Sequence, residues 1–328
     1  MEGVFDYAHG VCAVDAVYDG RPLQTAVHLV VEDGRALIVD TAVAPSAPRV
    51  LAALAAKGVS PECVDWIFLT HVHLDHAGGA GRLMRACPRA QLAVHSRGAR
   101  HVADPARLVA ATRAIYGEEA VRRVYGEVEP VPAARIVEVA DGARIAWGSR
   151  EFLFLDAPGH ARHHVAVRDS ASGAFFVGDT FGLSYPALAR DGRPAVFPTT
   201  SPSQFDPEAL LATVDRLLEY DPPAFYLAHF GELRRPGVVA ADFRRLVEAH
   251  AALALRARAA GAERHAALAA GVRALLLAER GRQGWPLAEE ALLRLFALDV
   301  ELNAQGLAAW LDTLPRKTAH ADSLSDGR

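Results

Sequence analysis

The stretch Thr70-His71-Val72-His73-Leu74-Asp75-His76-Ala77-Gly78-Gly79 places three imidazoles and a carboxylate within six positions, directly after the apolar run Trp66–Leu69. The apolar run predicts a short buried strand. In a chain that stays extended, alternate side chains share a face, so His71, His73 and Asp75 would point the same way. His76 would then point elsewhere, toward a second centre. Imidazole combined with carboxylate suits zinc, iron or manganese better than calcium or magnesium. The stretch therefore predicts a metal site at the end of a strand.

Other apolar runs of the chain also end at polar side chains of the kind that bind metals. The residues concerned are His160 after Glu151–Leu155, Asp179 after Ala174–Val177, and His229 after Ala224–Ala228. Sites in α/β sheets gather at the carboxyl ends of strands, where a rigid backbone positions the side chains that protrude. A single histidine at such a place is usually structural. Four such strand ends together predict convergence on one site.

The composition limits the class of protein. The 328 residues carry 35 Lys and Arg against 39 Asp and Glu, and 51% of them are hydrophobic, as in an ordinary soluble globular protein. The formal net charge of -4 argues against nucleic-acid and membrane-surface partners, which require a basic surface. Cys12, Cys63 and Cys87 are sparse and form no Cys-x-x-Cys pair, which favours reduced thiols. Because we find neither a signal-like N-terminus nor an apolar run of about eighteen residues, we expect a cytoplasmic protein.

Hairpin signals separate the first strands of the chain. Asp19-Gly20 and Asp33-Gly34 are pairs favoured in tight turns, and the runs that they separate are expected to be strands: Val11–Tyr18, Thr25–Val31 and Ala36–Val39. We expect Ser46 to cap the helix that follows, and Asp206, followed by Pro207, to cap a later one.

Helical patterns define the rest of the organisation. Residues 96–132 lack strand signals and are expected to form a helical insertion. It either covers a sheet edge or forms a lid over the metal site, with Tyr116 or Tyr125 touching substrate. From residue 236 the pattern is entirely helical. We therefore expect a catalytic domain over 1–235, a helical appendage over 236–315 and a disordered tail over 316–328.

The metal-binding pattern resembles the metallo-β-lactamase superfamily from about Val11 to Gly231. The resemblance implies a four-layer αβ/βα sandwich of the α/β (α+β) class, with two sheets face to face and two metal ions at one edge. It implies that the first ion is held by His71, His73 and His160, the second by Asp75, His76 and His229, and that Asp179 bridges both. Asp40 and His164 match positions that orient the ligands. Ala42 departs from the family, which usually has glycine at this position.

The chemistry of such a centre is hydrolytic. Two cations about 3.5–4 Å apart can share a water and lower its pKa, and the second cation polarises the substrate oxygen. A metal-bridging hydroxide is then the expected nucleophile. Asp75 is the candidate to orient it and to protonate the leaving group. Tyr185, on the loop after Asp179, is a candidate oxyanion donor.

The expected reaction is hydrolysis of a small acyl substrate: a thioester, as in a glyoxalase II-like branch, or a lactone or related ester. Two zinc ions are the expected cofactors, with iron or manganese as alternatives. An alternative of another class is a di-iron oxidoreductase, although the chain lacks the flavin domain of such relatives. A nuclease or phosphodiesterase fits the net charge poorly. We expect a small-molecule substrate and neither nucleic-acid nor membrane partners; the sequence is compatible with a homo-oligomer.

Overall fold

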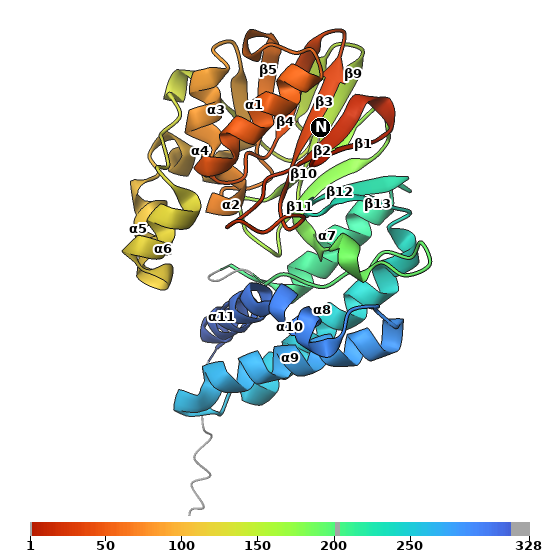
Figure 1. The fold of residues 1–328 in the computed structure, drawn as a ribbon. Helices are drawn as coiled ribbons and strands as arrows, with labels where there is room; N and C mark the ends of the chain where they lie inside the picture. Colours follow the sequence, from red (N-terminus) through yellow and green to blue (C-terminus); the bar gives the residue numbers. More distant parts are fainter. Residues whose placement is uncertain (1, 201–203, 316–328) are drawn as a thin grey trace, which may run out of the picture.

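The computed structural model of the chain describes residues 2–200 and 204–315; the tail at 316–328, expected to be disordered, lies outside them. Two β-sheets lie face to face with helices on their outer sides, and a group of C-terminal helices lies beneath the sandwich in the view of Figure 1. The four-layer sandwich with a helical appendage is therefore confirmed.

The first sheet has seven strands in chain order. Pairing is antiparallel from β1 to β4 and parallel from β4 to β7, so the later strands need the crossover connections that the helices provide. The turn expected at Asp33-Gly34 joins β3 to β4, with φ angles of 49° and 74°. The strands are β1 (Val4–Asp6), β2 (Val11–Asp15), β3 (Ala26–Glu32), β4 (Arg35–Val39), β5 (Val64–Phe68), β6 (Gln91–His95) and β7 (Ile136–Val139).

The second sheet has six strands in the order β13-β12-β11-β10-β9-β8. Its one parallel pair is β11 with β12. The sequence interpretation missed β8, β10 and β13, which are only four or five residues long. It also ended β11 too early, because that strand continues through Asp179. The strands are β8 (Arg144–Trp147), β9 (Arg150–Asp156), β10 (Val165–Asp169), β11 (Phe175–Leu183), β12 (Ala224–His229) and β13 (Gly231–Arg234).

Apolar side chains fill the space between the sheets, following the two-residue period of a strand. Along β4, Leu37 belongs to the cluster between the sheets, whereas Ile38 faces the outer helices. Phe68 of β5 packs edge-on against Phe152 and Phe154 of β9, with ring centroids 5.3 and 5.0 Å apart. This core fixes the position of the edge where β5, β11 and β12 carry the polar side chains.

Helices cover the outer faces of the sandwich. The apolar sides of α1 and α3 pack on the first sheet, and α7 packs on the second. Asp206 caps α7 as expected, because its carboxylate accepts from the Glu208 and Ala209 amides. The cap expected at Ser46 is wrong: the Ser46 hydroxyl donates to the Ala16 carbonyl instead. The helices up to α7 are α1 (Ala47–Ala56), α2 (Leu74–Ala77), α3 (Ala80–Ala86), α4 (Ser96–Ala103), α5 (Ala106–Tyr116), α6 (Glu118–Tyr125) and α7 (Pro207–Leu218).

Residues 96–132 contain α4, α5 and α6, of which α5 and α6 project from one side of the sandwich in Figure 1. The C-terminal helices are α8 (Gly237–Ala257), α9 (Arg264–Gln283), α10 (Glu289–Leu295) and α11 (Ala297–Thr313). One hydrophobic cluster runs from the second sheet through α7 into α8, α9 and α11. The domain boundary at 235/236 therefore stays a prediction. No helix among the described residues has the length and apolarity to cross a bilayer.

Candidate metal centre

Three histidine rings meet at the end of β5. His71 and His73 lie in the extended segment after the strand, and His160 lies in the turn between β9 and β10. His73 Nδ1 is 2.8 Å from His71 Nε2 and 3.1 Å from His160 Nε2. Burial lowers the pKa of all three rings, and neighbouring histidines lower those of His71 and His73 further. The rings are therefore neutral, and their nitrogen lone pairs are available to a cation.

A second group lies beside the first. His76 Nε2 and His229 Nε2 are 3.7 and 3.5 Å from Asp75 Oδ2. The expected extended geometry is wrong for Asp75, because α2 begins at Leu74. Successive side chains on a helix are separated by about 100°, not by the 180° of a strand. The short helix therefore turns both Asp75 and His76 toward the site.

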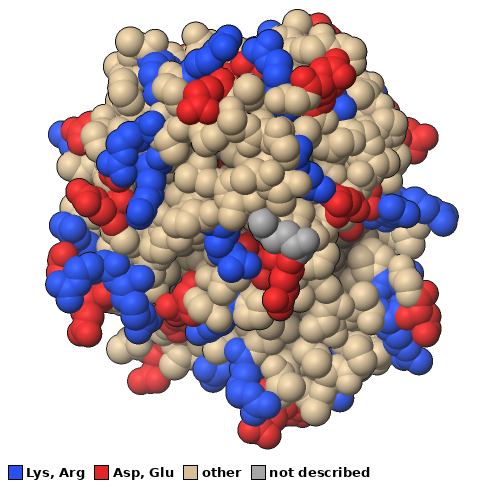
Figure 2. All heavy atoms as spheres, turned by 45° about the horizontal axis from the view of Figure 1, so that its top comes forward, with Lys and Arg blue, Asp and Glu red and all other residues tan. Residues whose placement is uncertain are grey.

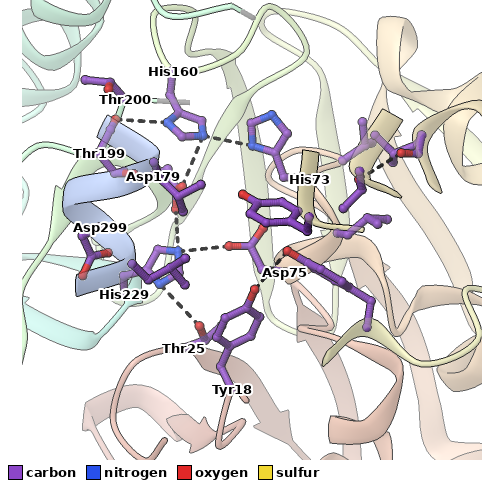
Figure 3. Close-up of a pocket in the computed structure, with 18 of the residues that line it drawn as sticks. Tyr18, Thr25, His73, Asp75, His160, Asp179, Thr199, Thr200, His229 and Asp299 are labelled. Carbon is purple, nitrogen blue, oxygen red and sulfur yellow. Dashed lines mark hydrogen bonds and ion pairs between the residues drawn. The ribbon is translucent and has the colours of Figure 1, made fainter. Parts of the chain in front are cut away.

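Asp179 lies between the two groups, as Figure 3 shows. Its Oδ2 is 3.2 Å from His160 Nε2, and its Oδ1 is 3.2 Å from His76 Nε2 and 3.4 Å from His229 Nε2. The residue lies inside β11 and not at its end. Gly178, with φ 48°, allows this: a Cβ there would lie 2.5 Å from the Thr70 hydroxyl. The seven side chains named by the resemblance are thus all brought together.

The residues present fit divalent metal ions. Candidate ligand atoms fall into three groups, and the atoms of each group lie within 4.8 Å of one another: His71, His73 and His160; His71, His76 and Asp179; Asp75, His76 and His229. Within the described part of the chain, the buried His76 Nε2 and Asp179 Oδ1 make no regular hydrogen bond and face only each other and the other candidate ligands, which is costly unless a cation lies among them. Nitrogen and carboxylate donors in this proportion suit zinc, iron or manganese.

The pKa values of His76 and His229 also indicate a cation site. Burial lowers the pKa of His76 and His229, but the carboxylates of Asp179 and Asp75 outweigh it, so the pKa of His76 lies well above its ordinary value and that of His229 rises to about 9. Two carboxylates crowded into a buried site attract positive charge. A bound cation would supply this charge in place of the two protons.

Hydrogen bonds from outside the site hold the rings of the candidate ligands in place. Asp40 Oδ2 accepts from His76 Nδ1 at 3.0 Å and from the Thr70 hydroxyl at 2.8 Å. His229 Nδ1 donates to the Gln24 carbonyl at 2.8 Å. Each bond on Nδ1 leaves Nε2 free to act as the ligand atom. His164 Nε2 accepts from the Asp179 amide at 3.2 Å, so both residues expected to orient ligands contact the site.

Tyr185 lies at the wall of the site, but its single hydroxyl proton is already used. The hydroxyl donates to the Asp299 carboxylate, with both oxygens at 3.2 Å. Burial raises the pKa of Asp299 to about 6. Sequence reasoning missed Asp299, which comes from α11, far along the chain. The available signal was a lone carboxylate in the apolar run Phe296–Val300.

A cavity of about 320 Å³ lies over the two groups and is lined by His73, Asp75, His160, Asp179 and His229. The insertion supplies one wall, including Leu108, Tyr116 and Tyr125, and α11 supplies another, including Leu298 and Leu302. The helical insertion and the C-terminal helix α11 therefore enclose the space in front of the candidate ligands.

The fold and the site define a class of protein. Residues 20–229 match the family model described as the metallo-beta-lactamase superfamily, and the chain belongs to this superfamily.

The curated relatives include hydroxyacylglutathione hydrolases. The protein of that name from Xanthomonas euvesicatoria pv. vesicatoria (strain 85-10) is 30% identical over 187 residues, which are 57% of this chain and 54% of the relative. The one from Synechococcus sp. (strain JA-3-3Ab) is 31% identical over 187 residues, with the same coverage. This chain thus spans about half the length of the curated relatives that it matches.

Solved structures share the fold. An archaeal metallo-beta-lactamase superfamily protein from Sulfolobus tokodaii aligns with a TM-score of 0.60 at 21% identity, covering 92% of this chain and 99% of that one. A metallo-beta-lactamase family protein from Thermus thermophilus aligns with the same score at 22% identity, covering 92% and 93%. Because the residues after 229 make up nearly a third of this chain, these alignments include much of the C-terminal helices.

Proposed function

We propose that this protein is a metal-dependent hydrolase of small acyl substrates, acting with two divalent ions, most simply zinc. The convergence of seven metal-binding side chains at the base of one cavity carries the proposal. His71, His73 and His160 would hold one ion, and a separate set, Asp75, His76 and His229, would hold the other. Asp179 would serve both.

When bound, the ions would lower the pKa of water to near neutrality and polarise the substrate carbonyl. The protein's own groups orient the reaction. The Asp75 side chain is 28% exposed, whereas that of Asp179 is only 5% exposed. Both carboxylates line the cavity, but Asp75 is the more accessible and is therefore the better placed to accept a proton from the attacking water and return it to the leaving group.

The cavity supports a compact substrate. Its volume of about 320 Å³ lies at the lower end of ligand pockets in general. Arg107 is the one Lys or Arg among the described residues that line it, so a multiply charged carrier such as glutathione lacks an obvious set of cationic partners there. The hydroxyacylglutathione hydrolase relatives favour a thioester substrate, whereas the apolar wall of the cavity favours a lactone or a simple ester. In all three classes of substrate, the water attacks an acyl carbon.

The charge distribution disfavours a nuclease activity. On the face drawn in Figure 2, cationic and anionic side chains are interspersed among uncharged residues, whereas a phosphate backbone calls for a continuous basic stripe. Iron analysis with a visible absorption spectrum would separate the hydrolase from a di-iron oxidoreductase.

The test combines metal analysis of the pure protein with a hydrolysis panel of thioesters, lactones, aryl esters and phosphodiesters. We expect two equivalents of metal, turnover of an acyl substrate, and loss of both in Asp179→Ala. Asp65→Ala, which alters a carboxylate on the opposite end of β5, is the control and should retain both. A protein that binds metal but hydrolyses nothing in the panel would contradict the proposal, as would full activity in Asp179→Ala.

A further inference from the structure

Two buried phenols meet in the wall of the cavity beside Asp75. Tyr18 lies between β2 and β3, and Tyr125 ends α6 in the insertion, so the two come from segments far apart in the chain. Their hydroxyl oxygens are 3.0 Å apart, and each residue is only 8% exposed. Both line the cavity, and Figure 3 shows the hydroxyl of Tyr18 directed toward Asp75.

The Tyr18–Tyr125 pair has one hydroxyl proton that is not used in a hydrogen bond between the two residues. Two phenols carry two hydroxyl protons, and Tyr18 donates its own to the Tyr125 oxygen, so the proton of Tyr125 is the one not used between them. Within the described part of the chain, neither hydroxyl has another hydrogen-bond partner. One proton is therefore left for a ligand in the cavity. Tyr185 differs, because Asp299 takes its only proton.

The surroundings keep both phenols protonated. Burial raises the pKa of Tyr125, and the nearby Asp75 carboxylate raises it further; burial and the neighbouring Tyr125 raise the pKa of Tyr18. A protonated phenol in a desolvated wall is a strong and preorganised donor to an oxygen that gains negative charge. Such a group stabilises the transition state more than the ground state.

We propose that the Tyr18–Tyr125 pair donates a hydrogen bond to the oxygen of the scissile acyl group on which negative charge develops. This inference rests on the proposed acyl hydrolysis and assigns a catalytic residue, Tyr125, to the helical insertion. Tyr18 acts through it as a positioning residue. The insertion is thus part of the catalytic apparatus and not only a cover for a sheet edge.

The test uses Tyr125→Phe, Tyr18→Phe and the double variant in the metal-loaded 328-residue chain. Phenylalanine retains the ring and removes only the hydroxyl. We measure kcat and KM on the acyl substrate found in the panel, metal content, thermal unfolding, and the affinity for phenylphosphonate, an anion that mimics the charged intermediate. Tyr220→Phe, an exposed tyrosine that packs on Phe175 away from the cavity, is the matched control.

We expect Tyr125→Phe to lower kcat about 100-fold, the effect of losing one oxyanion donor, with little change in KM or metal content. The double variant should lose little more than Tyr125→Phe, because the pair acts as one unit. Values of kcat within twofold of the wild type would overturn the inference, and so would a higher KM accompanied by metal loss, which indicates a structural role. If the wild type hydrolyses nothing, the proposed function fails, and phenylphosphonate affinity decides the inference: a tenfold loss in Tyr125→Phe supports it, and no loss overturns it.

Discussion

Replacing Asp40 by Asn tests how the protein prepares a metal ligand. Asp40 has a φ of 59°, a conformation that asparagine tolerates, so the backbone should be retained. The Asp40 side chain is 5% exposed, and its carboxylate accepts from the Thr70 amide, the Thr70 hydroxyl and His76 Nδ1. Every one of its partners is a donor. An amide group brings two donor hydrogens of its own into this position.

The magnitude follows from the contacts. If the amide nitrogen faces His76, the imidazole must move its proton to Nε2, the atom that points at Asp179. If it faces the Thr70 amide, two donors meet, and one buried N–H loses its partner at a cost of about 1–3 kcal/mol. Loss of a group that orients a ligand typically weakens metal binding about 10- to 100-fold, or about 1.4–2.8 kcal/mol. We expect this loss for the ion at Asp75, His76 and His229.

The assay is a competition titration of the metal-free protein against a chelator of known affinity, with the stoichiometry measured independently. Asp40→Asn should bind one ion as the wild type does and the other at least tenfold more weakly. Asp65→Asn is the matched control, since Asp65 accepts from Arg35 and Trp147 on the outer part of β5. Two ions bound by Asp40→Asn with wild-type affinity would refute the idea that Asp40 sets the tautomer of His76.

Three other predictions concern stability. Gly178→Ala should destabilise the fold by at least about 1–2 kcal/mol more than Gly58→Ala in denaturant titrations, because both glycines have positive φ but only at Gly178 would the Cβ meet neighbouring atoms; equal losses would contradict this. Asn303→Ala should cost about 2–4 kcal/mol, measured in the same way, because the buried Asn303 amide accepts from the Thr200 amide at 2.6 Å and donates to the Pro198 carbonyl at 3.1 Å, and both partners would lose their bonds. Burial lowers the pKa of His250 to about 4, so between pH 6.5 and 4 the unfolded chain binds a proton that the folded protein does not, and stability falls as the pH falls. His250→Leu should remove about 3 kcal/mol of the stability difference between pH 7 and pH 4; an unchanged difference would exclude this assignment.

The candidate metal ligands could be named from the sequence because their chemistry is dense and their spacing is short. His71, His73, Asp75 and His76 stand together, and distant partners mark the ends of apolar runs. Their local geometry was harder to predict. Nothing in the sequence shows that α2 begins at Leu74, since a four-residue helix has no clear periodicity.

Other features depend on tertiary contacts and could not be read locally. Ser46 has the residue type of a helix cap, but the Ala16 carbonyl, thirty positions away, takes its hydroxyl proton. Asp299 reaches the cavity only because α11 packs back against the sandwich. The Tyr18–Tyr125 bond joins residues 107 positions apart. The short motif predicts a metal site, whereas the walls of the cavity are formed by packing between distant segments and have no local sequence signal.

The candidate ligands are divided between the two sheets. His71, His73, Asp75 and His76 follow β5 in the first sheet, whereas His160, Asp179 and His229 belong to the second. Ion binding by these residues would therefore join the two halves of the sandwich, and a ligand that binds only the folded chain adds about 2.7 kcal/mol of stability at a free concentration of a hundred times its dissociation constant. A cell starved of the metal would hold this protein in a looser form, more open to proteases, so that the abundance of the protein would follow the supply of its ion.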